Sequence, residues 1–378
     1  MKTLHGSAQK FRFFRAAFPE VGLAQPKPQP MRLLFLSIFL LWVGCSPKES
    51  GSPSASATPS EPVLNFIHDW IPEPEHGGYY AADRLGLWKA EGVAVRVLVG
   101  GPNSEIETRV ALDPFGLGIV RGDAVFVAVE RGLPVVAVNA YFQHDPQGIM
   151  VREDSPVKTF ADLENRDIAM QIGATWLLYL QKKYALSQVR VRPATGNVAN
   201  FVKDPDWITQ AYPTSEPYYA LKEGVRSRVL QISESGFDPY RVIIANRQLV
   251  EKHPELVARF SRGAYRGWQE YYRNPQPIHD YLRSISPTME DGGMRFSYVA
   301  MRRLRLSEGD PSRAEAMGAV DLERWRSLGV ILKDLGVIQS VPPLESVVST
   351  AFTPKALGLD PTLPPPFWTD APTLSPQP

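Results

Sequence analysis

The sequence predicts an α/β protein with two lobes around a hinged cleft, and three observations support this fold class. From Val63 onward, short apolar runs of strand length alternate with amphipathic segments, which is typical of βαβ units and a largely parallel sheet. A second alternating set follows the first. A late apolar run at 242–245 then precedes a helical close, so the chain is predicted to leave the first lobe and return to it.

The first alternating set begins with a strand predicted over residues 63–67. The segment 76–91 is predicted to form one helix, because its tyrosines, leucines and tryptophan supply an apolar face. The remaining elements of this set are predicted as strands over 93–99, 118–120 and 134–140 and a helix over 124–131.

The second set is predicted to build a separate lobe. Its strands lie near 167–171, 188–192 and 207–210, and its helices near 176–184, 197–203 and 216–223. A buried strand at 242–245 and helices over 248–337 follow. The predicted division is 63–145 plus 240–350 for lobe 1, 146–239 for lobe 2, and 351–378 for a proline-rich tail that is either a wrap or an unstructured end.

The start of the chain has the features of a lipoprotein signal peptide, predicted over residues 31–44. An apolar run of signal-peptide length follows Met31-Arg32 and ends at Gly44-Cys45, although Trp42 stands where Leu is usual. Residues 1–30 are interpreted as an over-extended start, and 45–62, rich in Ser, Pro and Ala, as a disordered tether.

Cys45 is therefore predicted to be lipidated, with the protein exported and anchored on the periplasmic or cell-surface face of a membrane. The alternative is a buried structural cysteine behind an apolar helix. It is disfavoured because Cys45 is the only cysteine, and exported chains avoid unpaired thiols.

Composition and motif spacing exclude several function classes. Lys+Arg 41 against Asp+Glu 40 gives no net charge that would favour nucleic acid, so no nucleic-acid partner is expected. The six histidines are scattered and show no metal-ligand spacing, so no metal is expected. Neither a nucleophile elbow nor a phosphate-binding loop is present.

Several segments resemble, in order, the thiamine-pyrimidine type of periplasmic binding proteins. They are DWIPEPEHGGYY at 69–80, GLWKAEG at 86–92, GGPN at 100–103, RGLPVV at 131–136, QHDPQG at 143–148, SPVKTFADL at 155–163 and EPYY at 216–219. Members of this family share one fold with the binding proteins of nitrate, sulfonate and taurine importers and with the yeast-type pyrimidine synthase. The resemblance implies a type II periplasmic-binding-protein fold whose lobes close on a small ligand.

The resemblance also implies which residues line the cleft. By similarity, a carboxylate such as Glu216 accepts two hydrogen bonds from an aminopyrimidine edge while an aromatic ring stacks on its face. The ligand-binding residues implied in this way are Trp70, His76, Tyr79, Asn103, Asp123, Trp176, Glu216 and Tyr218.

Aromatic and histidine candidates also have structural interpretations. Trp70 could pack the end of a strand, and Tyr79 could belong to the core. Trp176 stands beside three leucines that mark a core helix, and His76 could be an exposed helix start.

The acidic candidates have structural interpretations as well. Asp123 could cap the helix that follows it, and Glu216 would suit the first turn of a helix through the helix dipole. One departure from the family concerns Gly122, which stands where Ser is frequent and so removes a hydroxyl from the expected cleft.

The predicted function is that of a solute-binding lipoprotein of an ABC importer, without cofactor or catalytic residues. Its ligand is expected to be a thiamine-precursor aminopyrimidine or a similar aromatic nutrient. Its partners are expected to be the permease and its ATPase, with the protein itself a monomer. Other ligands left open are sulfonate, nitrate, taurine and riboflavin.

An enzyme on the same fold, pyrimidine synthase-like or prephenate lyase-like, is the alternative class. The yeast-type synthase relies on a cysteine cluster, whereas this chain has no cysteine after Cys45. The pairs His68-Asp69 and His144-Asp145 admit a catalytic interpretation, but polar loops after strands explain them better.

Overall fold

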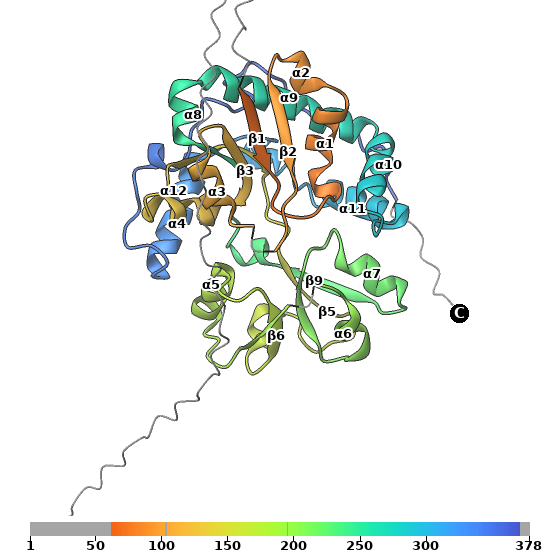
Figure 1. Cartoon of the computed structure of the whole chain (residues 1–378). Helices are drawn as coiled ribbons and strands as arrows, with labels where there is room; N and C mark the ends of the chain where they lie inside the picture. The colour runs from red at the N-terminus through yellow and green to blue at the C-terminus, as the bar shows by residue number, and fades with distance from the viewer. Residues whose placement is uncertain (1–61, 103, 195, 371–378) are drawn as a thin grey trace, which may run out of the picture. The chain divides into compact units, whose positions relative to one another are not determined.

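The computed structural model of the chain describes residues 62–102, 104–194 and 196–370. Two five-stranded sheets organise this part of the chain (Figure 1), with strand orders β2-β1-β3-β10-β4 and β7-β6-β8-β5-β9. The predicted α/β class with two sheet-containing lobes is confirmed. Residues 1–61, which include the predicted signal peptide, Cys45 and nearly all of the tether, lie outside the described residues.

The first sheet combines four early strands with one late strand, and we call it and its helices lobe 1. Its strands are β1 (Val63–Ile67), β2 (Ala94–Leu98), β3 (Gly116–Arg121), β4 (Val135–Phe142) and β10 (Arg241–Asn246). Strand β10 lies between β3 and β4 and runs antiparallel to both.

The second sheet comes from one continuous stretch of chain, and we call it and its helices lobe 2. Its strands are β5 (Gly148–Arg152), β6 (Asp167–Met170), β7 (Arg190–Pro193), β8 (Ile208–Ala211) and β9 (Ser227–Gln231). Strand β5 runs antiparallel to β8 and β9. The prediction of largely parallel sheets is therefore wrong for β5 and β10, because each begins where the chain arrives from the other lobe instead of from a crossover helix.

Helices cover both faces of the first sheet and flank the second. Those of lobe 1 are α1 (Gly77–Arg84), α2 (Leu87–Ala90), α3 (Ile106–Leu112), α4 (Gly122–Glu130), α8 (Arg247–Lys252), α9 (Pro254–Arg273), α10 (Gln276–Ile285), α11 (Asp291–Arg303) and α12 (Leu322–Asp334). Those of lobe 2 are α5 (Thr175–Tyr184), α6 (Ala199–Lys203) and α7 (Glu216–Lys222). The single helix predicted over 76–91 is wrong: Gly86 adopts a φ of +66°, in the left-handed region, and separates α1 from α2.

Two large hydrophobic clusters fill the described part of the chain. One lies between the first sheet and helices α1, α9, α10 and α11, and contains Phe66, Trp88 and Trp268. The close approach of α1 to α9 requires glycine, because a Cβ on Gly267 would lie 2.1 Å from the carbonyl oxygen of Gly78. The other cluster includes α4 and α12 residues and continues into lobe 2 through Ile149 and the β6 and α5 side chains.

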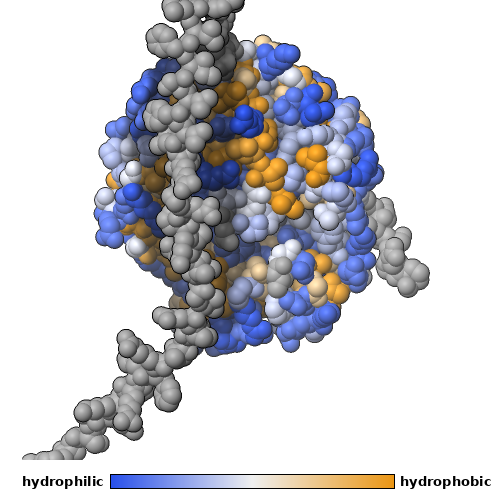
Figure 2. Space-filling view, viewed as in Figure 1, coloured by the Kyte–Doolittle hydropathy of each residue, from blue (hydrophilic) through white to orange (hydrophobic). Residues whose placement is uncertain are grey.

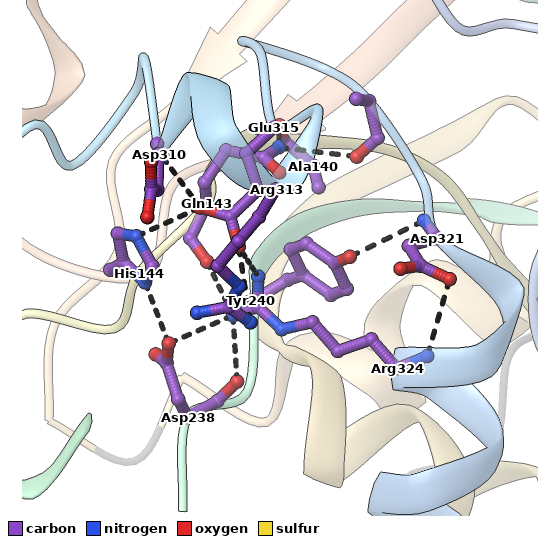
Figure 3. A network of polar contacts seen from close by, with 12 residues as sticks. Ala140, Gln143, His144, Asp238, Tyr240, Asp310, Arg313, Glu315, Asp321 and Arg324 are labelled. Carbon is purple, nitrogen blue, oxygen red and sulfur yellow. Dashed lines mark hydrogen bonds and ion pairs between the residues drawn. The ribbon is translucent and has the colours of Figure 1, made fainter. Parts of the chain in front are cut away.

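Two connections join the lobes, one from β4 to β5 and one from β9 to β10, and a polar network holds both (Figure 3). His144 in the first connection has Nδ1 2.6 Å from Asp238 Oδ2 and Nε2 3.1 Å from Glu315 Oε2. Asp238 belongs to the second connection. The structure thus gives His144 two carboxylate partners within the hinge, in agreement with the polar-loop interpretation of the pair His144-Asp145.

Arg324 of α12 completes the hinge network. Its guanidinium donates to the carbonyl oxygens of Gln143 (2.5 Å) and Asp238 (2.8 Å), one from each connection. It also lies 3.9 Å from the ring centroid of Tyr240 (Figure 3). Both connections are therefore fastened to a helix of lobe 1.

The proline-rich segment after α12 lies along lobe 1 as far as Asp370. Arg302 of α11 donates to the Pro364 carbonyl at 2.8 Å, and the Tyr298 hydroxyl accepts from the Phe367 backbone N–H at 2.8 Å. The Trp368 ring lies 5.2 Å from that of His279. Among the described residues, none of the helices is both long and apolar enough to cross a membrane.

Candidate ligand-binding site

A buried charge cluster marks the carboxyl edge of the first sheet, directly after β1. Asp69 has Oδ1 2.8 Å from His76 Nε2 and Oδ2 2.5 Å from Arg241 Nη1. The Arg241 Nε lies 3.5 Å from Asp145 Oδ1, and the same guanidinium donates to the hydroxyl of Tyr212 in lobe 2. Arg241 therefore joins lobe 1, the hinge and lobe 2 in one contact set.

Electrostatics favours the charged forms of Asp69 and Arg241 in this cluster. Burial alone would raise the pKa of Asp69, but Arg241 and His76 outweigh it and lower the pKa to about 2. Burial likewise opposes the charge of Arg241, yet Asp145 and Asp69 raise its pKa above the usual value. The Arg241 cation is thus fixed and already neutralised by two carboxylates.

Three further carboxyl groups meet where the lobes face each other, and we call Glu73, Glu75 and Glu216 the seam glutamates. Glu75 lies in a short 3-10 helix, η1 (Pro74–His76), and Glu73 is the residue directly before it. Glu216 is the first residue of α7 in lobe 2. Glu216 Oε2 accepts a 2.8 Å hydrogen bond from the backbone N–H of Tyr212. The seam glutamates therefore come from both lobes.

Burial and mutual repulsion favour the protonated form of these groups. Burial, then repulsion from Glu75, Asp69 and Glu216, raises the pKa of Glu73 well above its usual range. Burial raises the pKa of Glu216 to about 7. Burial also raises the pKa of Glu75, although Thr214 and its own backbone N–H act in the opposite direction.

Glu75 has unused hydrogen-bonding capacity at the seam. Its side chain is 5% exposed, and its Oε1 has no hydrogen-bond partner among the described residues. The Thr214 hydroxyl of lobe 2 and the Ser297 hydroxyl of α11 face this carboxyl group, and both Oγ atoms are buried without a well-formed hydrogen bond. The seam therefore presents acceptors and hydroxyls that a bound molecule can satisfy.

The lobes also touch through α7 and the start of α11. Lys222 Nζ lies 2.5 Å from Glu290 Oε1, and the Tyr218 hydroxyl donates to Glu290 Oε2 at 3.4 Å. A Cβ on Gly292 would lie 2.3 Å from the Tyr218 hydroxyl, so a side chain at position 292 would force the Tyr218 ring to shift. The arrangement is that of a closed cleft.

Exposed hydrophobic side chains follow β1 and β2 at the same edge of the sheet. Trp70 is 38% exposed and Ile71 39%, while Val99 follows β2 and is 53% exposed. Figure 2 shows hydrophobic residues gathered on this face over the part that carries β1, β2 and α1 in Figure 1. An aromatic ligand would therefore find both an exposed indole and carboxyl groups in the loop after β1.

Four of the predicted site residues lie at or beside the seam. His76 and Trp70 come with the loop after β1, and Glu216 and Tyr218 come with α7. The alternative of an exposed helix start is wrong for His76, which is 1% exposed and stacks on His68 with ring centroids 4.5 Å apart.

Three other predicted residues are packed away from the seam glutamates. Tyr79 is fully buried with its ring 4.9 Å from Phe66, and Trp176 is 1% exposed in the second hydrophobic cluster. Asp123 is buried and receives both hydrogen bonds of the Arg121 guanidinium, at 3.0 and 3.1 Å. Asp123 lies in the first turn of α4 and does not cap it. Asn103 lies outside the described residues.

Gly122 packs against α12. A Cβ at this position would meet Leu328 and Trp325 of α12 at 3.5 and 3.6 Å. The family's frequent serine hydroxyl would therefore face α12 here, so its loss leaves the seam glutamates unchanged.

Sequence reasoning missed several of the residues that form the site. Glu73 and Glu75 stand inside the DWIPEPEHGGYY motif, where two carboxyls in a non-repetitive loop were a usable signal. Arg241 was hard to predict as a site residue, because a charged residue just before the apolar run 242–245 is typical of the end of a strand. Tyr212 and Thr214 gave no signal, since their roles depend on how the lobes meet. Among the described residues, His, Cys, Asp and Glu do not form a group of three or more that could hold a metal ion.

Comparison with known proteins identifies the family. The family model described as NMT1/THI5 like matches residues 73–278, more than half of the 378 residues. The riboflavin-binding protein RibY of Chloroflexus aurantiacus is 22% identical over 344 residues, covering 86% of this chain and 98% of that protein. A 4-amino-5-hydroxymethyl-2-methylpyrimidine phosphate synthase of Candida albicans is 23% identical over 246 residues, covering 60% of this chain and 72% of that protein.

Among solved structures, the periplasmic sulfonate-binding protein SsuA of Methylobacillus flagellatus matches with a TM-score of 0.59 and 14% identity. The match covers 80% of this chain and 98% of that one. The predicted periplasmic-binding-protein fold is thereby confirmed. The family expected from the sequence motifs is confirmed as well: the chain belongs to the NMT1/THI5-like family.

Proposed function

We propose that the protein is an extracytoplasmic solute-binding protein that captures a small heteroaromatic nutrient between its lobes and delivers it to an ABC permease. The ligand class that we propose is an aminopyrimidine or a similar ring rich in N–H donors. The observation that carries this proposal is the seam itself, where Glu73, Glu75 and Glu216 come together from two lobes beside the exposed Trp70.

The chemistry of the seam supports N–H donors over an anionic ligand. Carboxyl oxygens accept hydrogen bonds from an amino-substituted ring, and the Trp70 indole offers a face for stacking. A sulfonate would instead meet three carboxyl groups, while the nearest guanidinium, Arg241, is already paired with Asp69 and Asp145. Riboflavin is the second candidate, because the relative named as a riboflavin-binding protein aligns with 86% of this chain.

Binding without turnover is the proposed activity. Relatives with enzymatic names and relatives named as binding proteins both align with this chain, so the distinction depends on this chain's own residues. No cysteine follows Cys45, and His76 is committed to Asp69. Conversion of a bound compound by the purified protein would contradict the proposal.

A thermal shift tests the ligand class. We expect 4-amino-5-hydroxymethyl-2-methylpyrimidine, or in its place riboflavin, to stabilise the protein by about 2.7 kcal/mol at roughly 100 times the dissociation constant. Glu216→Gln should weaken the effect, whereas Glu153→Gln, at a 60% exposed carboxylate of lobe 2, should leave it unchanged. An unmoved melting temperature with both compounds, and no small molecule retained in native mass spectrometry, would refute the proposed function.

Export and anchoring form the second part of the proposal. We expect Cys45→Ser to release the protein from the membrane fraction, because that thiol is the proposed site of lipidation. Fractionation followed by immunoblotting measures the change. A serine variant that still sediments with membranes would show that the lipid is not what holds the protein there.

A further inference from the structure

The seam glutamates have no cationic partner of their own. Among the described residues, Arg241 acts electrostatically on Glu73 and His76 acts on Glu75, but both basic groups are paired with Asp69. Lys222 of α7 is paired with Glu290 instead. The seam therefore holds three acidic groups, in addition to Asp69, that no Lys, Arg or His ion pair compensates.

Burial makes this lack of a counter-ion costly. Carboxylates removed from water and held near one another cannot all remain charged, so they either bind protons or acquire a cation. The raised pKa values of Glu73, Glu75 and Glu216 agree with the first outcome. The unpartnered Oε1 of Glu75 and the fully buried Thr214 Oγ1 show that the polar atoms of the seam are still unsatisfied.

We infer that the seam selects an organic cation of the amidinium type, whose parallel N–H groups supply the charge that Glu73, Glu75 and Glu216 lack. An amidinium edge carries two N–H donors that match the two oxygens of a carboxylate, which is a strong, charge-assisted arrangement. The inference rests on the proposed binding function, and it adds the charge state of the ligand to it.

The proton balance follows from the same geometry. A ligand that arrives as a cation leaves its N–H protons in place, and the proton held by a seam carboxyl is released to solvent. A neutral aminopyrimidine instead takes that proton on a ring nitrogen, and no proton is released. Both routes end with the same pair, a carboxylate and a cation.

Other charged and titratable groups surround the seam. They come from the loop after β1, from α1, from strands β4 and β10 and from helices α7 and α9, and are Asp69, His76, Tyr80, Tyr141, Arg241, Tyr219 and Tyr271. Asp69 and Arg241 are locked in a mutual ion pair, and burial raises the pKa values of the four tyrosines. The seam glutamates are therefore the groups whose protonation should change.

Three ring compounds of equal size and different charge test this inference: benzamidine, benzamide and benzenesulfonate. Titration of the full chain by ligand-observed NMR should give benzamidine an affinity at least about tenfold above that of benzamide, with no binding of benzenesulfonate. The benzamidine association constant should rise about tenfold per pH unit from pH 5 to 7 for each proton released, and level off above the Glu216 pKa of about 7.

Glu216→Gln should reduce both the benzamidine affinity and its pH slope, whereas the surface control Glu153→Gln should change neither. Equal affinities for benzamidine and benzamide, tighter binding of benzenesulfonate, or no binding of benzamidine would overturn the inference. A neutral riboflavin or pyrimidine ligand that still binds in that case would leave the proposed function standing, so the two failures are distinguishable.

Discussion

Replacing Arg241 by methionine is expected to lower the free energy of unfolding by about 3–5 kcal/mol, because the change strands two carboxylates that the guanidinium now neutralises. Asp69 and Asp145 would remain beside the cavity of the lost cation, and Asp145 is 3% exposed. The Tyr212 hydroxyl of lobe 2 would also lose its contact with lobe 1. Chemical denaturation measured by circular dichroism reports the loss.

Arg190 provides the matched control for Arg241. It also pairs with an aspartate, Asp167, but its side chain is 63% exposed on the edge strand β7. Arg190→Met should change the unfolding free energy by no more than about 1 kcal/mol, since water and salt screen an exposed pair. Similar losses for the two variants would show that Arg241 is not the buried centre of charge that the distances indicate.

Gly292→Ala is expected to weaken binding of 4-amino-5-hydroxymethyl-2-methylpyrimidine by at least about tenfold. The new Cβ would lie 2.3 Å from the Tyr218 hydroxyl, so this hydroxyl would have to leave Glu290 and the closed cleft would be disfavoured. Without ligand the cleft can open to relieve the contact, so the free energy of unfolding should change by no more than about 1 kcal/mol. Calorimetric titration measures the affinity, and small-angle scattering with ligand should show a larger radius of gyration than that of the unmodified protein.

The adjacent glycine offers the same substitution without the clash. A Cβ on Gly293 would approach Tyr218 and Tyr219 no closer than 3.3 Å, a distance that a small side-chain adjustment can relieve. Gly293→Ala should therefore bind the pyrimidine nearly as well as the unmodified protein. Identical behaviour of both variants would mean that the contact of α7 with α11 does not limit closure.

Local periodicity predicted most of the fold, and long-range pairing explains where it failed. The strand at 63–67 and the helix at 216–223 were predicted because apolar spacing and helix-start signals are local. Strands β5 and β9 were not predicted, since Gly148–Arg152 and Ser227–Gln231 are short and carry no turn signal that separates them from loops. The direction of β10 depends on the path of the chain between lobes, which periodicity cannot encode.

Site prediction was limited for a different physical reason. The family motifs predicted that Trp70, His76 and Glu216 line the cleft, and all three lie at or beside the seam. These positions were recognisable because they follow a strand or begin a helix. The burial of Glu75 and the pairing of Arg241 depend on contacts between side chains more than 100 residues apart in sequence, within lobe 1 for Arg241 with Asp69 and between the lobes for Glu75 with Thr214. Spacing along one segment contains no information on such encounters.

The path of the chain through the two sheets also predicts the order in which they assemble. The second sheet uses only residues from Gly148 to Gln231, so all five of its strands can pair once that stretch has been synthesised. The first sheet is complete only when β10 enters between β3 and β4, and Arg324 of α12, 86 residues after Asp238, then donates to both connections. The discontinuous lobe is therefore expected to complete more slowly. Until β10 arrives, β4 has no partner strand and one edge of β3 is unpaired, so this incomplete sheet is the part of the chain that a chaperone would have to shield.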